Sequence, residues 1–137
     1  MITSFATLLQ QIKADFDAAF VVSIPLPTAY PNATFTPPAT GLYARLSVVM
    51  GEGEQTQFGS TKRFRDVGNL FVQIYAPIGT GEGAAAAAAE SIAARYRAVS
   101  RVNATFLTPS IQPGGRDPVE PRWITTVRCP FYADREV

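Results

Sequence analysis

The residues best placed to do chemistry form one glycine-rich stretch, Ile78-Gly79-Thr80-Gly81-Glu82-Gly83-Ala84. Gly79, Gly81 and Ala84 match G-x-G-x-x-G/A, the turn that lets a backbone approach a pyrophosphate at the start of a helix. Two features argue against a nucleotide: Glu82 would repel a phosphate, and Asn103 stands about twenty residues on, where dinucleotide sites carry an acid. We therefore interpret the stretch Gly79–Ala84 as a strand-to-helix turn, with a nucleotide-binding enzyme as the alternative.

Other groups that serve in catalysis are scarce. The sequence contains no His, which removes the commonest general base and most zinc sites. Its one Cys, Cys129, can form neither an intramolecular disulfide nor a thiolate cluster, and its place in an alternating strand predicts a small core residue. The acidic pairs Asp15/Asp17 and Glu52/Glu54 match no catalytic motif, so we expect them on solvated faces. The sequence thus predicts no catalytic residue, no metal and no cofactor.

Length and composition limit the class of protein to which these residues belong. A length of 137 residues suits a single domain spanning residues 1–137, and an apolar content of 47% is enough for a core. Only 17% of the residues are charged, which predicts a surface partly covered by other subunits. The net charge of +1 argues against attraction to nucleic acid or to an anionic membrane. Charges interrupt the N-terminal apolar pattern, so we expect neither a signal peptide nor a membrane span.

Two helices are expected around these groups. Apolar residues at helical spacing predict an opening helix over residues 5–20, with Thr3 or Ser4 as its cap. The glycine turn leads into an alanine-rich stretch of high helix propensity, which predicts a second helix over residues 82–99.

Strands and connections fill the rest of the chain. Five prolines make residues 25–41 an extended connection, anchored by Tyr30 and Phe35. The polar, glycine-rich residues 51–61 predict a flexible loop that exposes Phe58. The predicted strands are 42–49, one from Arg63 that is clearest over 70–76, 102–112, and 123–131 after a turn at 113–118. This order predicts an α+β fold: a mostly antiparallel or mixed β-sheet of about 4–5 strands with two α-helices packed on one face.

A short basic run, Lys62-Arg63-Phe64-Arg65, has three interpretations. It fits a solvated strand edge, a protein interface or contact with a phosphate backbone. In a nearly neutral chain the first of these is favoured.

Several motifs occur in a characteristic order along nearly the whole chain. They are Tyr30-Pro31-Asn32, Phe35-Thr36-Pro37-Pro38, Gly41-Leu42-Tyr43-Ala44-Arg45, Gly68-Asn69-Leu70-Phe71-Val72-Gln73-Ile74-Tyr75-Ala76-Pro77 with Gly79-Thr80-Gly81, Pro113-Gly114-Gly115-Arg116 and Pro130-Phe131-Tyr132-Ala133-Asp134. With this set the sequence resembles the tail terminator-like proteins of long-tailed phages.

The resemblance implies a structural virion protein rather than an enzyme. Such proteins form a ring, hexameric in known members, on the head-proximal end of the phage tail tube. The ring ends tube polymerisation and offers a surface for head-tail joining. The implied partners are copies of the chain itself, the major tail tube protein and a head-side connector protein, with no membrane and no specific nucleic acid. Assembly would take place in the host cytoplasm.

Interface residues can be proposed only from exposure and position. The first candidates are Gln55, Thr56, Gln57 and Phe58, and the second are Arg63, Arg65, Arg116 and Asp117. Two alternatives to a terminator remain besides the enzyme: a head-tail connector or other neck protein of the same virion, and a monomeric host-derived module without a role in assembly.

Overall fold

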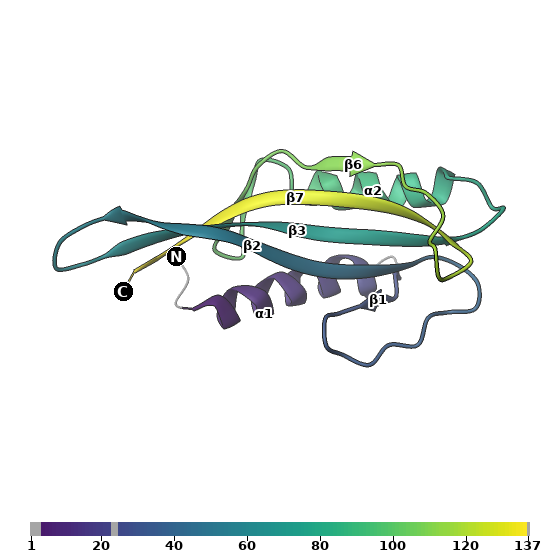
Figure 1. Cartoon of the computed structure of the whole chain (residues 1–137), viewed down its shortest axis with the longest axis horizontal. Helices are drawn as coiled ribbons and strands as arrows, with labels where there is room; N and C mark the ends of the chain where they lie inside the picture. The colour runs from purple at the N-terminus through teal and green to yellow at the C-terminus, as the bar shows by residue number, and fades with distance from the viewer. Residues whose placement is uncertain (1–3, 23–24, 137) are drawn as a thin grey trace.

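Three long antiparallel strands dominate the structure, a computed structural model that describes residues 4–22 and 25–136 (Figure 1). They are β2 (Tyr43–Gln57), β3 (Arg63–Pro77) and β7 (Arg122–Glu136), with β3 in the middle. The β3–β7 ladder is unbroken over its full length, whereas the β2–β3 ladder shifts register between Met50 and Gly53 and again between Gln55 and Gln57. Alternation along the strands places one set of side chains on the core face and the other set outside.

Short strands complete a mixed sheet. These are β1 (Thr28–Ala29), which runs parallel to β2, and β4 (Ser100–Arg101), β5 (Ala104–Phe106) and β6 (Ser110–Gln112). The strand order is β1-β2-β3-β7-β5-β4, and β6 also pairs with β7.

The predicted number of about 4–5 strands was therefore wrong, since the described sheet has seven strands. A tight turn interrupts the strand expected over 102–112, because Val102 and Asn103 both have positive φ, at 51° and 63°. The residues on either side of this turn pair with each other as β4 and β5. Thr28 and Ala29 form a strand in spite of the surrounding prolines.

The helices are α1 (Phe5–Phe16), which continues into a π-helical segment η1 (Asp17–Val21), and α2 (Gly83–Arg95). Ser4 caps α1 as expected, with its Oγ accepting from the Thr7 amide at 3.1 Å. The second helix ends earlier than predicted, because Ala98 takes a positive φ of 48° and its amide donates to the Leu107 carbonyl at 2.8 Å.

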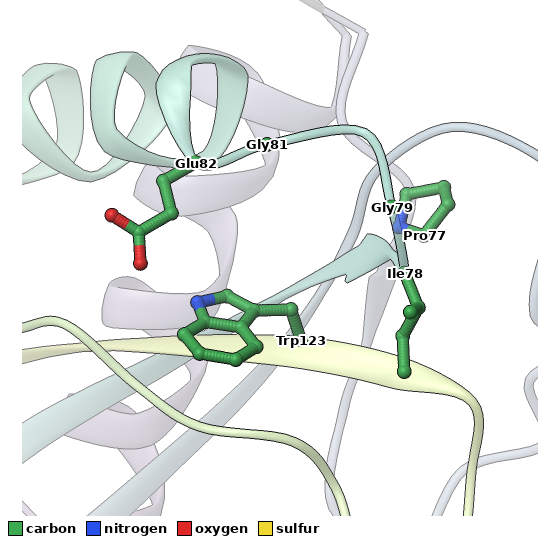
Figure 2. Close-up of a pocket in the computed structure, with 6 residues that line it drawn as sticks. All are labelled: Pro77, Ile78, Gly79, Gly81, Glu82 and Trp123. Carbon is green, nitrogen blue, oxygen red and sulfur yellow. The ribbon is translucent and has the colours of Figure 1, made fainter.

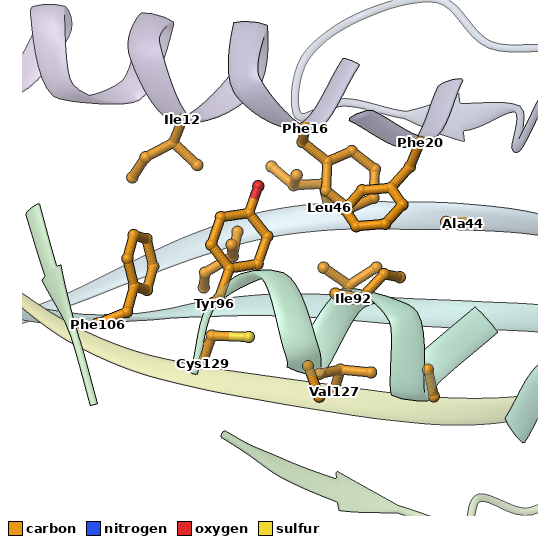
Figure 3. Close-up of a cluster of buried hydrophobic side chains, with 14 of the residues drawn as sticks. Ile12, Phe16, Phe20, Ala44, Leu46, Ile92, Tyr96, Phe106, Val127 and Cys129 are labelled. Carbon is orange, nitrogen blue, oxygen red and sulfur yellow. The ribbon is translucent and has the colours of Figure 1, made fainter. Parts of the chain in front are cut away.

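The sheet curls, and the two helices lie along different strands of it (Figure 1). The helix α1 lies on the β2 side and α2 on the β7 side, so the prediction of two helices packed on one face describes the arrangement only in part. Both helices contribute to one buried cluster (Figure 3). The labelled members of this cluster are Ile12, Phe16, Phe20, Ala44, Leu46, Ile92, Tyr96, Phe106, Val127 and Cys129.

Asp15 joins the two helices and is not on a solvated face, which corrects the expectation for this residue. Its carboxylate accepts from Arg95 at 2.7 and 3.0 Å and from the Tyr96 hydroxyl at 2.9 Å, and Arg101 lies 3.5 Å away. Burial alone would raise the pKa of Asp15, but the hydrogen bonds from Arg95 and Tyr96 and the two positive charges lower it below its usual value. The carboxylate therefore stays charged at neutral pH and fixes α1 against the end of α2.

Cys129 confirms its predicted role. It is fully buried between β3 and the helices, pairing with Leu70 in the ladder. Burial raises the pKa of its thiol to about 12, so at neutral pH it is a protonated core side chain and not a nucleophile.

Candidate functional site

The hairpin of β2 and β3 runs past the helices and projects from one end of the molecule (Figure 1). We call residues 51–67 and 134–136 the arm. Residues 51–57 are paired strand rather than the flexible loop expected from their sequence, and only residues 58–62 form the turn. No described helix runs along the arm in Figure 1, and its ion pairs join one strand to another.

A bulge and a glycine mark the base of the arm. The register shift between Met50 and Gly53 lets β2 bend and twist away from the body of the sheet. Opposite it, Gly68 packs so tightly that a Cβ atom would lie 2.8 Å from the Met50 Sδ and 3.0 Å from the Phe131 ring. This crowding makes the lack of a side chain at Gly68 a requirement of the arm's attachment.

Ion pairs run along the arm. Arg65 forms a two-pronged pair with Asp134, at 2.9 and 3.1 Å, and its guanidinium lies 4.1 Å from the centre of the Tyr132 ring. The pairs Arg63–Glu136 and Arg135–Asp66 each span 3.1 Å. The hydrogen bond from Arg65 lowers the pKa of the Asp134 carboxyl.

The basic run is therefore not the solvated strand edge that was favoured, because β3 is the middle strand and two of the arginines are paired to β7. Their charge is matched within the chain, which weakens the case for a phosphate backbone as partner. Lys62 differs: it is exposed in the turn, and no ion pair holds it among the described residues.

The tip of the arm brings six of the eight predicted interface residues together. The Gln55 amide donates to the Gln57 carbonyl at 3.1 Å, and the Thr56 hydroxyl donates to the Arg63 carbonyl at 3.3 Å, which closes the turn. Phe58 is 78% exposed at the end, as expected. Gln55, Thr56, Gln57, Phe58, Arg63 and Arg65 therefore share one end of the molecule.

Arg116 and Asp117 lie at the other end, beside the start of β7. The fifteen residues of β3 separate the two ends by roughly 46 Å at about 3.3 Å per residue. Arg116 forms a backbone bridge to Trp123, and the Asp117 carboxylate accepts from the amides of Val119 and Glu120 at 2.7 and 3.1 Å. These backbone hydrogen bonds lower the pKa of Asp117, so this side chain shapes its own turn. The two sets of candidates therefore lie at opposite ends of the sheet.

An aromatic and arginine cluster, which sequence reasoning missed, fixes this second end. Arg122 is 7% exposed and donates to the Gly41 carbonyl at 2.8 Å and to the Pro38 carbonyl. Its guanidinium lies 5.1 Å from the centre of the Tyr43 ring, which stacks on Tyr75 at 4.7 Å. The Tyr43 hydroxyl donates to Glu120, and burial, with this bond, raises the pKa of Tyr43. A charged residue at a strand start carries no sequence signal for such a role.

The expected anchors of the proline-rich connection are confirmed. The Tyr30 hydroxyl donates to the Asp17 carboxylate at 3.0 Å, and Lys13 lies 4.5 Å from the centre of the Tyr30 ring. Phe35 packs against Tyr43 with ring centres 5.6 Å apart. These contacts fasten the proline-rich connection to α1 at one end and to β2 at the other.

A pocket of about 280 Å³ lies at the glycine turn that links β3 to α2 (Figure 2). Gly79 and Gly81 have positive φ values of 87° and 82°, which explains why glycines stand there. Its other lining residues are Pro77, Ile78, Glu82 and Trp123.

The chemistry of this pocket does not favour a nucleotide. No cation lines it, Glu82 carries a negative charge beside it, and its volume is below the usual range for small-molecule sites. One polar group is unsatisfied: the Trp123 Nε1–H is buried without a hydrogen-bond partner, and it faces the side on which Glu82 lies (Figure 2). The described residues include no group of three His, Cys, Asp or Glu side chains that could hold a metal ion. None of the described helices is long and apolar enough to cross a membrane.

Comparison with known proteins gives two findings. The model of a family described as "Phage tail terminator protein" matches residues 7–131. One solved structure is similar in fold over 93% of this chain and 95% of its own, with a TM-score of 0.55 and 23% sequence identity. No curated protein matches the sequence.

Proposed function

Since the chain belongs to the phage tail terminator family, we propose that it forms a ring that caps the head-proximal end of the tail tube. The ring would end tube polymerisation and present the surface for head-tail joining. Its partners would be further copies of the chain, six in all, the major tail tube protein and a head-side connector protein. Assembly would take place in the host cytoplasm, and the product would be part of the virion tail.

The family match over residues 7–131 carries this proposal, and the shape of the molecule supports it. A cap needs one face that fits the tube and another that does not accept a further tube ring. This chain has two dissimilar ends, a bare, ion-paired arm and an end built on Arg122 and stacked tyrosines. Subunits with dissimilar ends can join head to tail, and such contacts form a ring when the rotation between subunits closes.

The outer face of the sheet offers further surface for subunit contacts. Apolar side chains on this face include Val49, 54% exposed, and Val67, 41% exposed. Neither belongs to the buried cluster to which both helices contribute. Single exposed valines are ordinary on soluble proteins, so this face is available for a subunit contact rather than marked as one. Coverage of the face by a neighbour would fit the low charge content of 17%.

The decisive experiment is disruption of the gene in its phage. The proposed function predicts tails that exceed the normal length and lack heads in electron micrographs, with normal virions restored by the intact gene. Tails of normal length that fail to join heads would instead identify a neck protein. In vitro, the purified chain should stop elongation of growing tube protein, and tubes that continue to grow would contradict the proposal.

The enzyme alternative has its own test. Calorimetric titration with NAD or ATP should show no binding, since the family is structural and the glycine turn carries an acid. Tight nucleotide binding, lost on substitution of the glycine turn, would contradict a purely structural role.

A further inference from the structure

We propose that Phe58 at the arm tip of one subunit inserts into the pocket beside Trp123 of the next copy of this chain. This rests on the proposed ring and names the contact that closes it. The pocket is the one lined by Pro77, Ile78, Gly79, Gly81, Glu82 and Trp123. The occupant is a segment that every copy carries, residues 58–62.

The tip presents a single large apolar group in polar surroundings. Phe58 is 78% exposed, and its neighbours in the turn are Gly59, Ser60, Thr61 and Lys62. The hydrogen bonds from Gln55 and Thr56 shape the tip before any partner binds. A preformed tip loses little conformational entropy on docking. Docking is favourable only if the Phe58 ring is removed from water, so the partner surface must offer an apolar recess.

The pocket supplies such a recess at the right scale. Its walls are the apolar side chains of Pro77, Ile78 and Trp123, and Ile78 is 43% exposed. A space of about 280 Å³ is small for a cofactor and suits one aromatic side chain. The face of the Trp123 indole offers the offset or edge-on packing that aromatic pairs prefer.

Two polar features of the pocket match the tip. The Trp123 Nε1–H is buried without a partner, and a turn of its indole toward the inserted tip would give it a backbone carbonyl as acceptor. Glu82 is exposed at the pocket and caps no amide with its side chain, while Lys62 stands four residues after Phe58 and is also exposed. These two opposite charges would meet when the tip docks.

Distance makes the contact one between subunits. The tip precedes β3 and the pocket follows it, so about 46 Å of unbroken strand separates the two. Phe58 therefore cannot reach the pocket of its own chain. A contact between two different patches on identical subunits is heterologous, and its repetition gives a ring when the rotation between subunits closes.

Cysteine cross-linking tests the contact directly. Phe58→Cys and Ile78→Cys are made as separate variants, and Cys129 gives little background because it is fully buried. Mixed and oxidised at ring-forming concentration, or on tail tubes, the two variants should give a covalent dimer. Each variant alone should give none, because the same position would not meet itself. A mixture of Phe5→Cys with Ile78→Cys is the matched control, since Phe5 is also an exposed phenylalanine.

Association measurements add an energetic test. Phe58→Ala should weaken ring formation about tenfold or more, as loss of a central anchor does, whereas Phe5→Ala should leave it unchanged. Lys62→Glu and Glu82→Lys should each weaken it about two- to fivefold, and the double variant should recover most of that loss. Circular dichroism on each variant verifies that the fold is retained.

The outcomes separate this contact from the wider function. Rings that assemble and cap tubes without any 58–78 cross-link would overturn the contact and leave the proposed function intact. Phe58→Ala rings of normal mass that no longer cap tubes would also overturn it, and would place the tip on the tube. Failure of the intact chain both to assemble and to cap would contradict the proposed function itself.

Discussion

The arm and the body are built from the same three strands, yet they are stabilised differently. In the body, β3 buries Leu70, Val72 and Ile74 completely beneath the helices. In the arm, the same strand carries Arg63, Phe64 and Arg65, all only half-buried, and its partners are charged groups across the ladder. The difference shows that the sheet of this chain extends beyond its hydrophobic core. The unsupported half is where a surface for other molecules can be placed.

The largest expected effect comes from the body. Leu70→Ala should lower the free energy of unfolding by about 3 kcal/mol, because it leaves a cavity at a fully buried site between Val48 and Cys129. Urea unfolding followed by circular dichroism measures this change. Val67→Ala, three residues away and 41% exposed, is the control and should change the same quantity by less than about 0.5 kcal/mol. Equal losses would mean that the core extends into the arm.

A second effect sharpens the contrast between the two ends of β7. Arg122→Ala should cost about 2–3 kcal/mol in urea unfolding, since it removes charged hydrogen bonds to the Gly41 and Pro38 carbonyls and leaves them unpaired. Arg128→Ala, in the same strand but exposed, should have almost no effect. If both variants have the same free energy of unfolding, the contacts of Arg122 do not stabilise this end of the molecule.

An intermediate effect concerns the link between the helices, and it depends on pH. Asp15→Asn should lower stability at pH 7 by about 1–2 kcal/mol, because it weakens the hydrogen bonds from Arg95 and Tyr96. The folded pKa of Asp15 is lowered, so its contribution is complete above the ordinary value of 3.8 and is lost as pH falls through the folded pKa.

Urea unfolding at several pH values checks this prediction. The intact chain should lose more stability than Asp15→Asn on acidification below pH 3.8. Glu90→Gln, on the exposed side of α2, controls for the removal of one acidic charge. Equal losses of unfolding free energy on acidification in the intact chain and in Asp15→Asn would exclude the hydrogen bonds to Asp15 as the cause.

The smallest effect is expected in the arm. Arg65→Ala and Asp134→Ala break the best ion pair there, but exposed pairs add little to global stability, so urea midpoints should not move measurably. Hydrogen exchange should nevertheless accelerate at arm amides while body amides keep their protection. A lowered urea midpoint, or unchanged hydrogen exchange at the arm amides, would contradict the distinction between the two regions.

Hydrophobic spacing and helix propensity were sufficient to predict the body. A regular stripe predicted α1 and helix propensity predicted α2. Alternation predicted the central parts of β2, β3 and β7, because burial on one face imposes this period. The arm could not be predicted this way. Gly51, Glu52, Gly53 and Glu54 have low strand propensity, and only their pairing to β3 makes them a strand.

The candidate surfaces could also be predicted from the sequence only in part. Exposure of Phe58 in a polar stretch pointed to the tip. Nothing in the sequence indicated that Arg63 and Arg65 pair with residues some seventy positions later, since such contacts follow from topology. Trp123 was expected only as a member of a strand face. Its position beside the glycine turn, with an unsatisfied N–H, depends on where the sheet ends.

The unbroken ladder between β3 and β7 has a mechanical consequence. Fifteen consecutive residue pairs join the two strands from Arg63–Glu136 to Pro77–Arg122 without a bulge. A slip by one residue would turn every core side chain of β3 outward, so the pair resists shear. The pair of β3 and β7 is therefore stiff along its length, whereas β2, which contains register shifts, deforms more easily. A push on the tip would therefore be transmitted along β3 and β7 to Pro77 and Trp123 at the opposite end of the sheet.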